Sequence, residues 1–355
     1  MANDFNNLIV HFIPTDSPSR GWGKTSTKPL NLSIEMRNYT ILILLIGSFY
    51  KIQAQQEAHY TQYMYNNLLV NPAFAGSRRV ASVNVLYRNQ WIGFKGNPRS
   101  FLASFDSPWM SKNRLGLGLI LSNQSEGIIS RLALTPSVSY AIIHTEESTL
   151  RIGISASYRQ YRFDLQSSTV NIQQRQDPTL SENDNPSLNN MNLGMGIYYD
   201  RKNIYAGLSI PNLNQNPLIL NQDASVQLKG TEHKHIYAMV GGLFSLGGNE
   251  NIQLKPSMMF KYVANAPFSV DATMSILFKK KFTGGISYRT GSDGSIGDSV
   301  DLLSFVQIND SFAVGMAYDF TLSQISNYNR NSLEILARYD FAISAKVMHN
   351  PRFFF

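Results

Sequence analysis

Residues 268–278 read FSVDATMSILF, and every second side chain of this run, from Phe268 to Phe278, is apolar. Successive side chains of a strand point to opposite faces of a sheet, so the run predicts a strand with one apolar and one mostly polar face. Charged side chains of such runs keep to one face, as at Asp271 and Asp319. The same alternation recurs at 115–122, 150–159, 312–321 and 333–344. The chain is therefore predicted to be all-β.

The connections between the runs alternate between short and long ones. Short joins are predicted at 108–113, 144–148, 201–203, 247–251, 279–281 and 309–311. Long joins are predicted at 91–99, 123–130, 164–190, 211–234, 264–267, 290–298 and 323–331. A transmembrane barrel has short periplasmic turns and longer outer loops, whereas a soluble all-β domain has no reason to keep this order.

The lengths of the runs also favour a membrane barrel. Each run is close to the roughly 9–11 residues that a tilted strand needs to cross a bilayer, and a soluble domain would favour shorter strands. We predict a closed, antiparallel transmembrane β-barrel of about 14 strands over residues 80–344, with both termini in the periplasm.

The composition fits a barrel and excludes other classes. Hydrophobic residues make up 43% of the chain, yet no apolar run approaches the roughly 20 residues of a membrane-spanning helix. There is no cysteine, which excludes disulfides, thiolate metal sites and a lipoprotein anchor. Basic and acidic residues are dispersed without a basic stripe, so no nucleic-acid partner is expected. Candidates for the aromatic girdles of a barrel are Trp91, Trp109, Tyr140, Tyr161, Tyr199 and Tyr288.

Three segments precede the predicted barrel. Residues 36–54 have a positive start at Arg37, an apolar run at 41–49 and a polar end, which predicts a secretory signal peptide cleaved near Ala54. Residues 1–35 stand in front of it, either because the start codon is assigned too far upstream or because the extension is genuine. Residues 55–79 are polar and aromatic, and we expect them in the periplasm or in the barrel as a plug.

The sequence contains blocks that are more specific than its alternation. They are QYM at 62–64, NPAFAG at 71–76, YRNQWIGF at 87–94, AYDFT at 317–321, SLEI at 332–335 and NPRFF at 350–354. These blocks resemble the PorP/SprF family of type IX secretion outer-membrane proteins, and the resemblance covers essentially the whole chain after the signal peptide. The chain departs from the family at 331–333, where the family usually has a Gly-Ser-His type approach to the last strand.

The resemblance implies a component of the type IX secretion and gliding machinery in the cell outer membrane. Such a barrel is expected to anchor a secreted adhesin non-covalently, or to assist its export, through the C-terminal sorting domain of the adhesin. It is also expected to contact outer-membrane lipid and, on the periplasmic side, other secretion components. The alternative is a passive outer-membrane pore or small-molecule transporter.

The candidate partner-binding residues are Tyr63, Asn71, Pro72, Arg88, Trp91, Pro351 and Arg352. Asn71-Pro72 disfavours a helix and marks a turn, and the block at 63–76 is either a plug or a docking surface. Arg88 is expected to face the lumen, where it would pair with Asp106 on the next strand or contact a partner. Residues 345–355 are predicted to form a periplasmic tail, unless the last strand extends into them.

No enzyme, cofactor or metal site is expected. Convergent catalytic groups are the signature of a hydrolase, and the histidines repeat no such spacing. His233-Lys234-His235 places a cation between two imidazoles, which does not suit a four-ligand zinc site. Residues 218–220, LIL, lie in a predicted outer loop and are either a contact for a secreted ligand or packing inside the barrel mouth. The histidines that fall in tails, turns or loops are His59, His144, His233, His235 and His349.

Overall fold

The structure is a computed structural model that describes residues 59–109, 114–164, 186–222, 226–264, 266–290, 297–322 and 331–341. All of them belong to one compact unit, Lys51–Phe355. The predictions for residues 1–35, for the signal peptide at 36–54 and for the tail at 345–355 concern residues outside these ranges.

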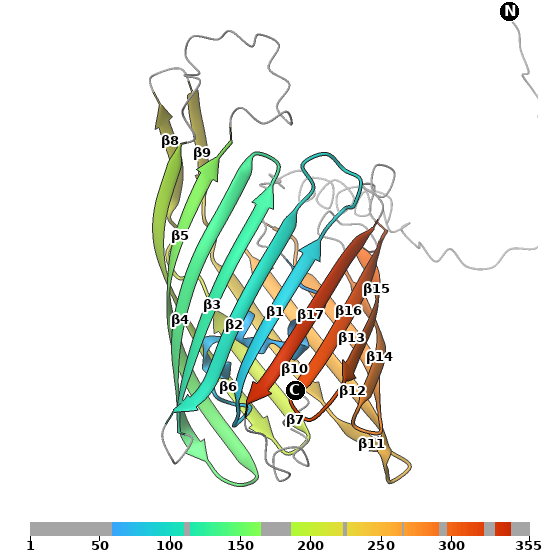
Figure 1. The fold of residues 1–355 in the computed structure, drawn as a ribbon. Helices are drawn as coiled ribbons and strands as arrows, with labels where there is room; N and C mark the ends of the chain where they lie inside the picture. The colour runs from blue at the N-terminus through green and yellow to red at the C-terminus, as the bar shows by residue number, and fades with distance from the viewer. Residues whose placement is uncertain are drawn as a thin grey trace, which may run out of the picture. The chain divides into compact units, whose positions relative to one another are not determined.

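The described chain winds into an antiparallel barrel (Figure 1). Its strands are β1 (Ala81–Asn89), β2 (Arg99–Trp109), β3 (Leu115–Glu126), β4 (Ile129–His144), β5 (Ser148–Phe163), β6 (Ser187–Arg201), β7 (Ile204–Ile210), β10 (His235–Gly242), β11 (Phe244–Leu246), β12 (Asn249–Val263), β13 (Ser269–Phe278), β14 (Phe282–Arg289), β15 (Ser299–Gln307), β16 (Phe312–Thr321) and β17 (Ser332–Phe341).

The barrel closes where its first strand meets its last. β1 and β17 pair over their whole lengths, from Ala81 opposite Phe341 to Asn89 opposite Leu333. β10 and β11 follow each other along β12, so they are two segments of one barrel strand interrupted at Leu243. Over the described residues, the 15 strands of this sheet therefore occupy 14 positions around the barrel. The predicted closed antiparallel barrel and its strand number are confirmed.

The alternation of the sequence becomes the two faces of the wall. In β13, Asp271 and Thr273 point into the barrel and are buried, whereas Met274 and Ile276 point outward and are about half exposed. β16 and β17 follow the same pattern, with Glu334 buried on the inner face. A wall with an apolar outside and a polar inside is the arrangement that lipid on one side and water or paired charges on the other require.

The strand joins gather at two ends of the barrel. One end carries the joins after β2, β4, β6, β11, β13 and β15, together with the first residue of β1 and the last residue of β17. We call it the tight-turn end, and the opposite end the loop end. All six predicted short joins lie at the tight-turn end. The alternation of short and long joins therefore correctly predicted which joins share an end of the barrel.

One of the predicted long joins is wrong, and a second has the predicted bounds but contains strands that the sequence did not predict. At 123–130, β3 and β4 stay paired until they meet at a two-residue turn, Gly127-Ile128, and Gly127 supplies the positive φ of 58° that this turn needs. At 211–234, the join contains a hairpin of β8 (Pro217–Gln222) and β9 (Val226–Thr231), which pair with each other in a separate two-stranded sheet. Figure 1 shows this hairpin at the loop end.

Several strands are longer than the expected span. β4 and β5 have 16 residues each, and β6 and β12 have 15. Because neighbouring strands satisfy each other's backbone groups, pairing continues past the apolar band into residues with polar side chains on both faces, such as Asn123 and Gln124. Sequence polarity therefore marks the edge of the membrane span and not the end of the strand.

Three short 3₁₀ helices lie inside the barrel: η1 (Tyr63–Tyr65), η2 (Asn67–Leu69) and η3 (Pro72–Phe74). We call residues 59–75 the plug. Its apolar side chains and the inward-facing apolar side chains of the wall form the main buried cluster of the structure, around Met64, Leu68 and Phe74. Among the described residues, no helix is long and apolar enough to cross a membrane.

Candidate functional site

The plug runs down the inside of the barrel from the loop end toward the tight-turn end. Glu334 lies near the loop end of β17, Ser104 lies in the middle of β2, and Ser139 lies near the tight-turn end of β4. Three hydrogen bonds to these side chains mark its course: Gln62 N to Glu334 Oε1 (2.8 Å), Asn66 Nδ2 to Ser104 Oγ (2.8 Å) and Ser139 Oγ to Ala75 O (2.6 Å).

A buried charge cluster holds the start of the plug. The Arg88 guanidinium lies 2.5 Å from a carboxylate oxygen of Asp319 and 3.1 Å from one of Glu334, and these three side chains are at most 3% exposed. The Thr61 hydroxyl donates to Asp319 over 3.0 Å, and the Thr61 N–H donates to Glu334 over 3.1 Å. Buried charges are tolerated when they are paired and hydrogen-bonded, and here the backbone of the plug completes the bonding.

A second buried cluster lies at the loop ends of β12, β13 and β14. The Lys261 ammonium and the Arg289 guanidinium both contact Asp271, at 2.5 Å and 3.0 Å. The Nδ1 atom of His59 lies 2.6 Å from Lys261 Nζ. Burial, and then the positive charges of Lys261 and Arg289, hold the pKa of His59 well below its ordinary value. Because an ammonium group can only donate, His59 Nδ1 accepts this hydrogen bond from Lys261.

A third cluster fixes the link between the plug and β1. Asp340 accepts from Arg78 at 3.3 Å, from Arg338 at 3.1 Å and from the Ser82 hydroxyl at 2.6 Å. All four side chains are buried at the tight-turn end. The plug is thus attached to the wall by charge clusters near both of its ends.

Asn71-Pro72 forms the seat of η3. The Asn71 side chain accepts a hydrogen bond from Ala73 N and donates one to the carbonyl oxygen of Ile197 on β6, each over 2.9 Å. Pro72 occupies the first position of η3, where a missing N–H costs nothing and the fixed φ suits a helical turn. The same dipeptide therefore caps the helix and ties it to the wall.

Glycines of the wall allow the plug to approach this closely. A Cβ atom added to Gly116 would lie 2.0 Å from the carbonyl oxygen of Ala75, and one on Gly196 would lie 2.1 Å from Asn71 Oδ1. One on Gly153 would lie 2.4 Å from Ala73 N. Real side chains do not fit at such distances, so each of these positions needs glycine because the plug is seated there.

A chamber of about 110 Å³ lies between the plug and the loop end. Its floor is made by plug residues, among them Leu68 and Val70, and its walls by β3, β4 and β5. The walls carry two cations, Arg131 and Arg159, and a row of hydroxyl groups. These hydroxyl-bearing residues are Ser122, Thr135, Ser137, Ser155 and Ser157.

Glu232 ties the β8–β9 hairpin to the rim of this chamber. Its carboxylate accepts hydrogen bonds from Tyr161 Oη (2.6 Å), Asn216 Nδ2 (2.8 Å) and Asn192 Nδ2 (3.0 Å), and it pairs with Arg159 at 3.3 Å. Burial alone would raise the pKa of Glu232, but Arg159 and the three donors outweigh it and lower the pKa. The prediction that Tyr161 belongs to an aromatic girdle is wrong, because its ring faces the lumen.

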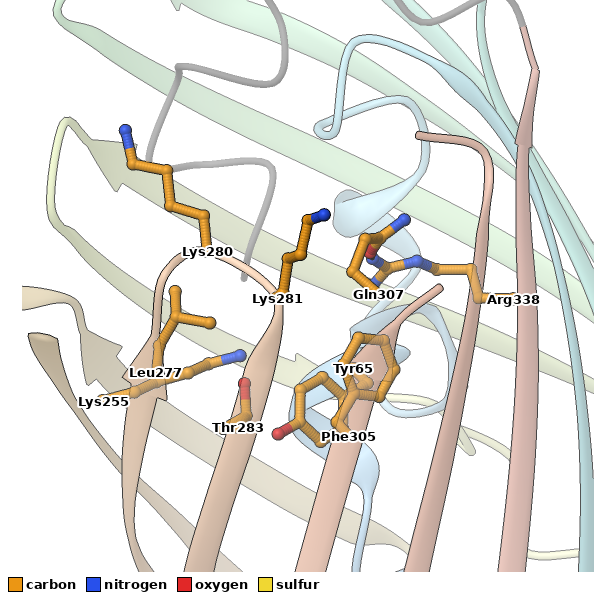
Figure 2. Close-up of a pocket in the computed structure, with 9 residues that line it drawn as sticks. All are labelled: Tyr65, Lys255, Leu277, Lys280, Lys281, Thr283, Phe305, Gln307 and Arg338. Atoms are coloured by element: carbon orange, nitrogen blue, oxygen red, sulfur yellow. The ribbon is translucent and has the colours of Figure 1, made fainter. Parts of the chain in front are cut away.

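A smaller pocket, of about 10 Å³, lies on the other side of the plug at the tight-turn end. Figure 2 shows its nine lining residues around the stacked rings of Tyr65, from the plug, and Phe305, from β15. The ring centroids are 4.2 Å apart. Four cationic side chains line the pocket: Lys255, Lys280, Lys281 and Arg338.

The predicted site residues have the following places. Tyr63, Asn71, Pro72 and Arg88 are buried inside the barrel. Trp91 is half-buried in the join between β1 and β2, with a φ of 53°. Pro351 and Arg352 lie outside the described residues. The structure thus brings four of the candidates together on or against the plug.

The predicted pairing of Arg88 with Asp106 is wrong. In the antiparallel register of β1 and β2, Arg88 stands opposite Ser100 and Asp106 stands opposite Ser82, near the other end of both strands. Arg88 pairs with Asp319 and with Glu334, its direct neighbour across the β1–β17 seam.

Sequence reasoning missed most of the residues that build the interior. Asp271, Glu334 and Asp340 were placed on the polar faces of strands without a role. Single charges on the inward face of a membrane strand are a usable signal, since each needs a partner inside the barrel. The identity of the partner depends on strand register, which the sequence pattern does not supply.

Comparison with known proteins gives a family and a set of distant structural neighbours. The family model described as "Type IX secretion system membrane protein PorP/SprF" matches residues 52–339. No curated protein matches the sequence. Among solved structures, the chain is similar to a FadL homologue of Pseudomonas aeruginosa, with 12% identity, 81% of this chain and 96% of that chain covered, and a TM-score of 0.45.

Two further neighbours are similar at the same low level. The toluene transporter TbuX of Ralstonia pickettii has 10% identity, with 79% of this chain and 93% of that chain covered and a TM-score of 0.44. The outer membrane protein Omp33 of Acinetobacter baumannii has 8% identity, with 74% and 98% covered and a TM-score of 0.41. Likenesses at this level say nothing about what this chain binds.

Proposed function

Because the chain belongs to the PorP/SprF family of type IX secretion system membrane proteins, we propose that it is a plugged outer-membrane barrel that captures a secreted adhesin. The adhesin is held non-covalently, through its C-terminal sorting domain, for export or for retention at the cell surface. The protein works as an anchor and catalyses no reaction. It reaches the outer membrane through a signal peptide at residues 36–54 that is cleaved on export.

The seated plug is the observation that carries this proposal. It runs along the lumen, is held by charge clusters near both ends, and rests on glycines that leave no space for a side chain. A passive pore needs a continuous path of water through the barrel, and an anchor does not. The presence of the plug therefore favours the proposal of a rigid anchor over the alternative of an open pore.

The loop end supplies the capture surface in this proposal. Outer loops are the longer ones in transmembrane barrels, so the loop end faces outward and the tight-turn end faces the periplasm. At the loop end lie the chamber and the β8–β9 hairpin, where Ile219 is exposed and Leu218 packs toward Tyr161 and Phe163. Surface loops on a rigid scaffold are common places for binding.

A cross-linking capture experiment tests the proposal. The tagged full-length barrel is purified from cells after cross-linking, and bound proteins are identified with the position of each cross-link by mass spectrometry. We expect a large secreted protein, linked through its C-terminal domain to the loop end. Cross-links confined to the tight-turn end, or recovery of no secreted protein, would contradict the proposal.

Conductance in planar bilayers tests the alternative. We expect the purified barrel to show no steady single-channel current, because the plug fills the lumen. A steady current of porin size, in a preparation whose barrel is folded, would favour the passive pore instead.

A further inference from the structure

The pocket at the tight-turn end has a lining of unusual charge. Its nine lining residues include Lys255, Lys280, Lys281 and Arg338, and none of these nine described residues is Asp or Glu. Lys280 pairs with the exposed Glu250 at 3.2 Å and Arg338 pairs with Asp340 at 3.1 Å, both of which lie outside the lining. The lining therefore carries four cationic side chains and, among the described residues, no acidic one.

Two of the cations are held in place by the aromatic stack. Lys255 Nζ lies 4.3 Å from the centroid of the Tyr65 ring, and Arg338 Cζ lies 4.8 Å from the centroid of the Phe305 ring. Because the two rings stack on each other, a cation sits on each outer face of the pair. Figure 2 shows Lys255 and Arg338 on either side of the two rings and Lys281 above them.

The turn that carries the other lysines is itself unusual. The three residues between β13 and β14 are all lysine, and Lys279 and Lys280 have φ values of 50° and 55°. Positive φ favours Gly, Asn or Asp in a tight turn, so backbone conformation does not explain the choice of lysine at these positions. The charge of the side chains is the property that distinguishes this turn.

We propose that this pocket is a binding site for a carboxylate group of a partner protein, an acidic side chain or a chain terminus, that docks on the tight-turn end. Ammonium and guanidinium groups form charge-assisted hydrogen bonds with oxyanions. In the orientation proposed above, the partner is a periplasmic protein with an acidic segment. The site itself does not depend on the identity of the secreted cargo.

The place and size of the pocket favour a carboxylate over a lipid phosphate. Lys255, Thr283, Gln307 and Arg338 are buried on the inner face of the wall, whereas lipid surrounds its outer face. The volume of about 10 Å³ is about that of one water, so a single carboxylate oxygen can enter while the rest of the group stays outside, and a sugar or nucleotide cannot enter. Tyr65 of the plug lines this pocket, so a bound carboxylate would lie beside the plug inside the barrel.

A binding titration with the full-length barrel tests the proposal. The barrel is held in zwitterionic nanodiscs and titrated with an N-acetylated, C-amidated tetraglutamate peptide, with tetraglutamine capped in the same way as the neutral control probe. We expect tetraglutamate to bind and tetraglutamine not to bind. Lys281→Gln should weaken tetraglutamate binding about tenfold, the order expected for one charge-assisted contact. The matched control is Lys202→Gln, an exposed lysine in another turn of the same end, which should leave binding unchanged.

Several results would overturn the proposal. These are no binding of tetraglutamate, equal weakening by Lys281→Gln and Lys202→Gln, or tighter pocket-dependent binding of inorganic phosphate than of the peptide. Capture of the adhesin at the loop end is a separate measurement, so failure here leaves the proposed function standing.

Discussion

At the scale of single residues, the contact between plug and wall depends on glycine. Gly116, Gly153 and Gly196 each face a plug atom at a distance that a Cβ could not keep. By contrast, Gly284 in β14 has no atom within 4 Å of the place where its Cβ would lie. The wall thus offers a test position and a matched control of the same residue type.

We expect Gly196→Ala to displace Asn71 and loosen the plug. Overpacking of this kind costs about 1–3 kcal/mol, and loss of the Asn71 contacts should also raise hydrogen exchange in residues 71–75. Thermal unfolding in detergent and exchange mass spectrometry measure the two effects. Gly284→Ala should change neither, and equal effects of both variants would contradict the seating of the plug on Gly196.

A variant of Arg88 can distinguish a structural role of this residue from a role in binding a partner. Arg88→Gln leaves the buried Asp319 and Glu334 without their cation, which should lower the free energy of unfolding by about 3–5 kcal/mol. Lys202→Gln removes only an exposed pair with Glu147 and should leave the free energy of unfolding nearly unchanged. If Arg88 acts inside the barrel, adhesin recovered per folded barrel should stay unchanged in Arg88→Gln. A large loss of adhesin without loss of stability would make Arg88 a partner contact instead.

His59 gives the interior a pH dependence. Its pKa lies below the ordinary value of 6.5 because of burial and the charges of Lys261 and Arg289, opposed by Asp271. A folded-state pKa below the unfolded one means that the fold favours the neutral imidazole. The stability from this group is therefore complete above pH 6.5 and is lost as the pH falls from there toward the folded pKa.

We therefore expect the unfolding temperature to fall between pH 7 and pH 5, in the window just below the ordinary pKa of 6.5. His59→Gln should flatten this part of the profile, because glutamine does not titrate. A slope that persists unchanged in His59→Gln would assign the pH dependence to other groups.

At the scale of elements, the β8–β9 hairpin is separable from the barrel. Its strands pair with each other and form a sheet of their own over the described residues. We expect replacement of residues 217–231 by a short Gly/Ser linker to leave a folded, heat-modifiable barrel on gels while reducing cross-linked adhesin severalfold. The same linker inserted at Gly247-Gly248, in a turn at the tight-turn end, should leave adhesin recovery unchanged. Loss of the folded barrel in the first variant would show that the hairpin is structural.

Some features of the strands could be predicted from the sequence, and others could not. Strand faces, strand number and the separation of the two ends follow from alternation and join lengths, because lipid and lumen impose a strict period on each strand. The extension of β3 and β4 through 123–130 does not follow, because side chains there are polar on both faces and resemble a loop.

The contacts between the plug and the wall cannot be predicted from the sequence, for a different reason. The contact of Gln62 with Glu334 joins positions 272 residues apart, and the partner of each inward charge is set by register across several strands. Asn71-Pro72 signals a turn in the sequence, but the glycines that receive it, such as Gly196, look like ordinary strand glycines until the chain is folded. Four of the candidates therefore lie on or against the plug, namely Tyr63, Asn71, Pro72 and Arg88, but their contacts could not be predicted.

At the scale of the whole molecule, the two ends of the barrel should face different compartments. The absence of cysteine makes this testable with single introduced thiols. We expect Lys95→Cys, in the exposed join between β1 and β2, to react with a membrane-impermeant maleimide on intact cells. Lys202→Cys, in the turn between β6 and β7, should react only after the outer membrane is permeabilised. The reverse pattern would invert the proposed orientation.

The position of the plug in the chain also bears on how the barrel assembles. The plug comes before β1 in the chain, and the wall closes by pairing β1 with β17, the last strand of the described residues. Glu334, on that last strand, holds the backbone of Thr61 and Gln62 at the start of the plug. Closing the seam therefore also completes the charge cluster that holds the start of the plug, and a chain that stops before β17 can form neither the seam nor these contacts.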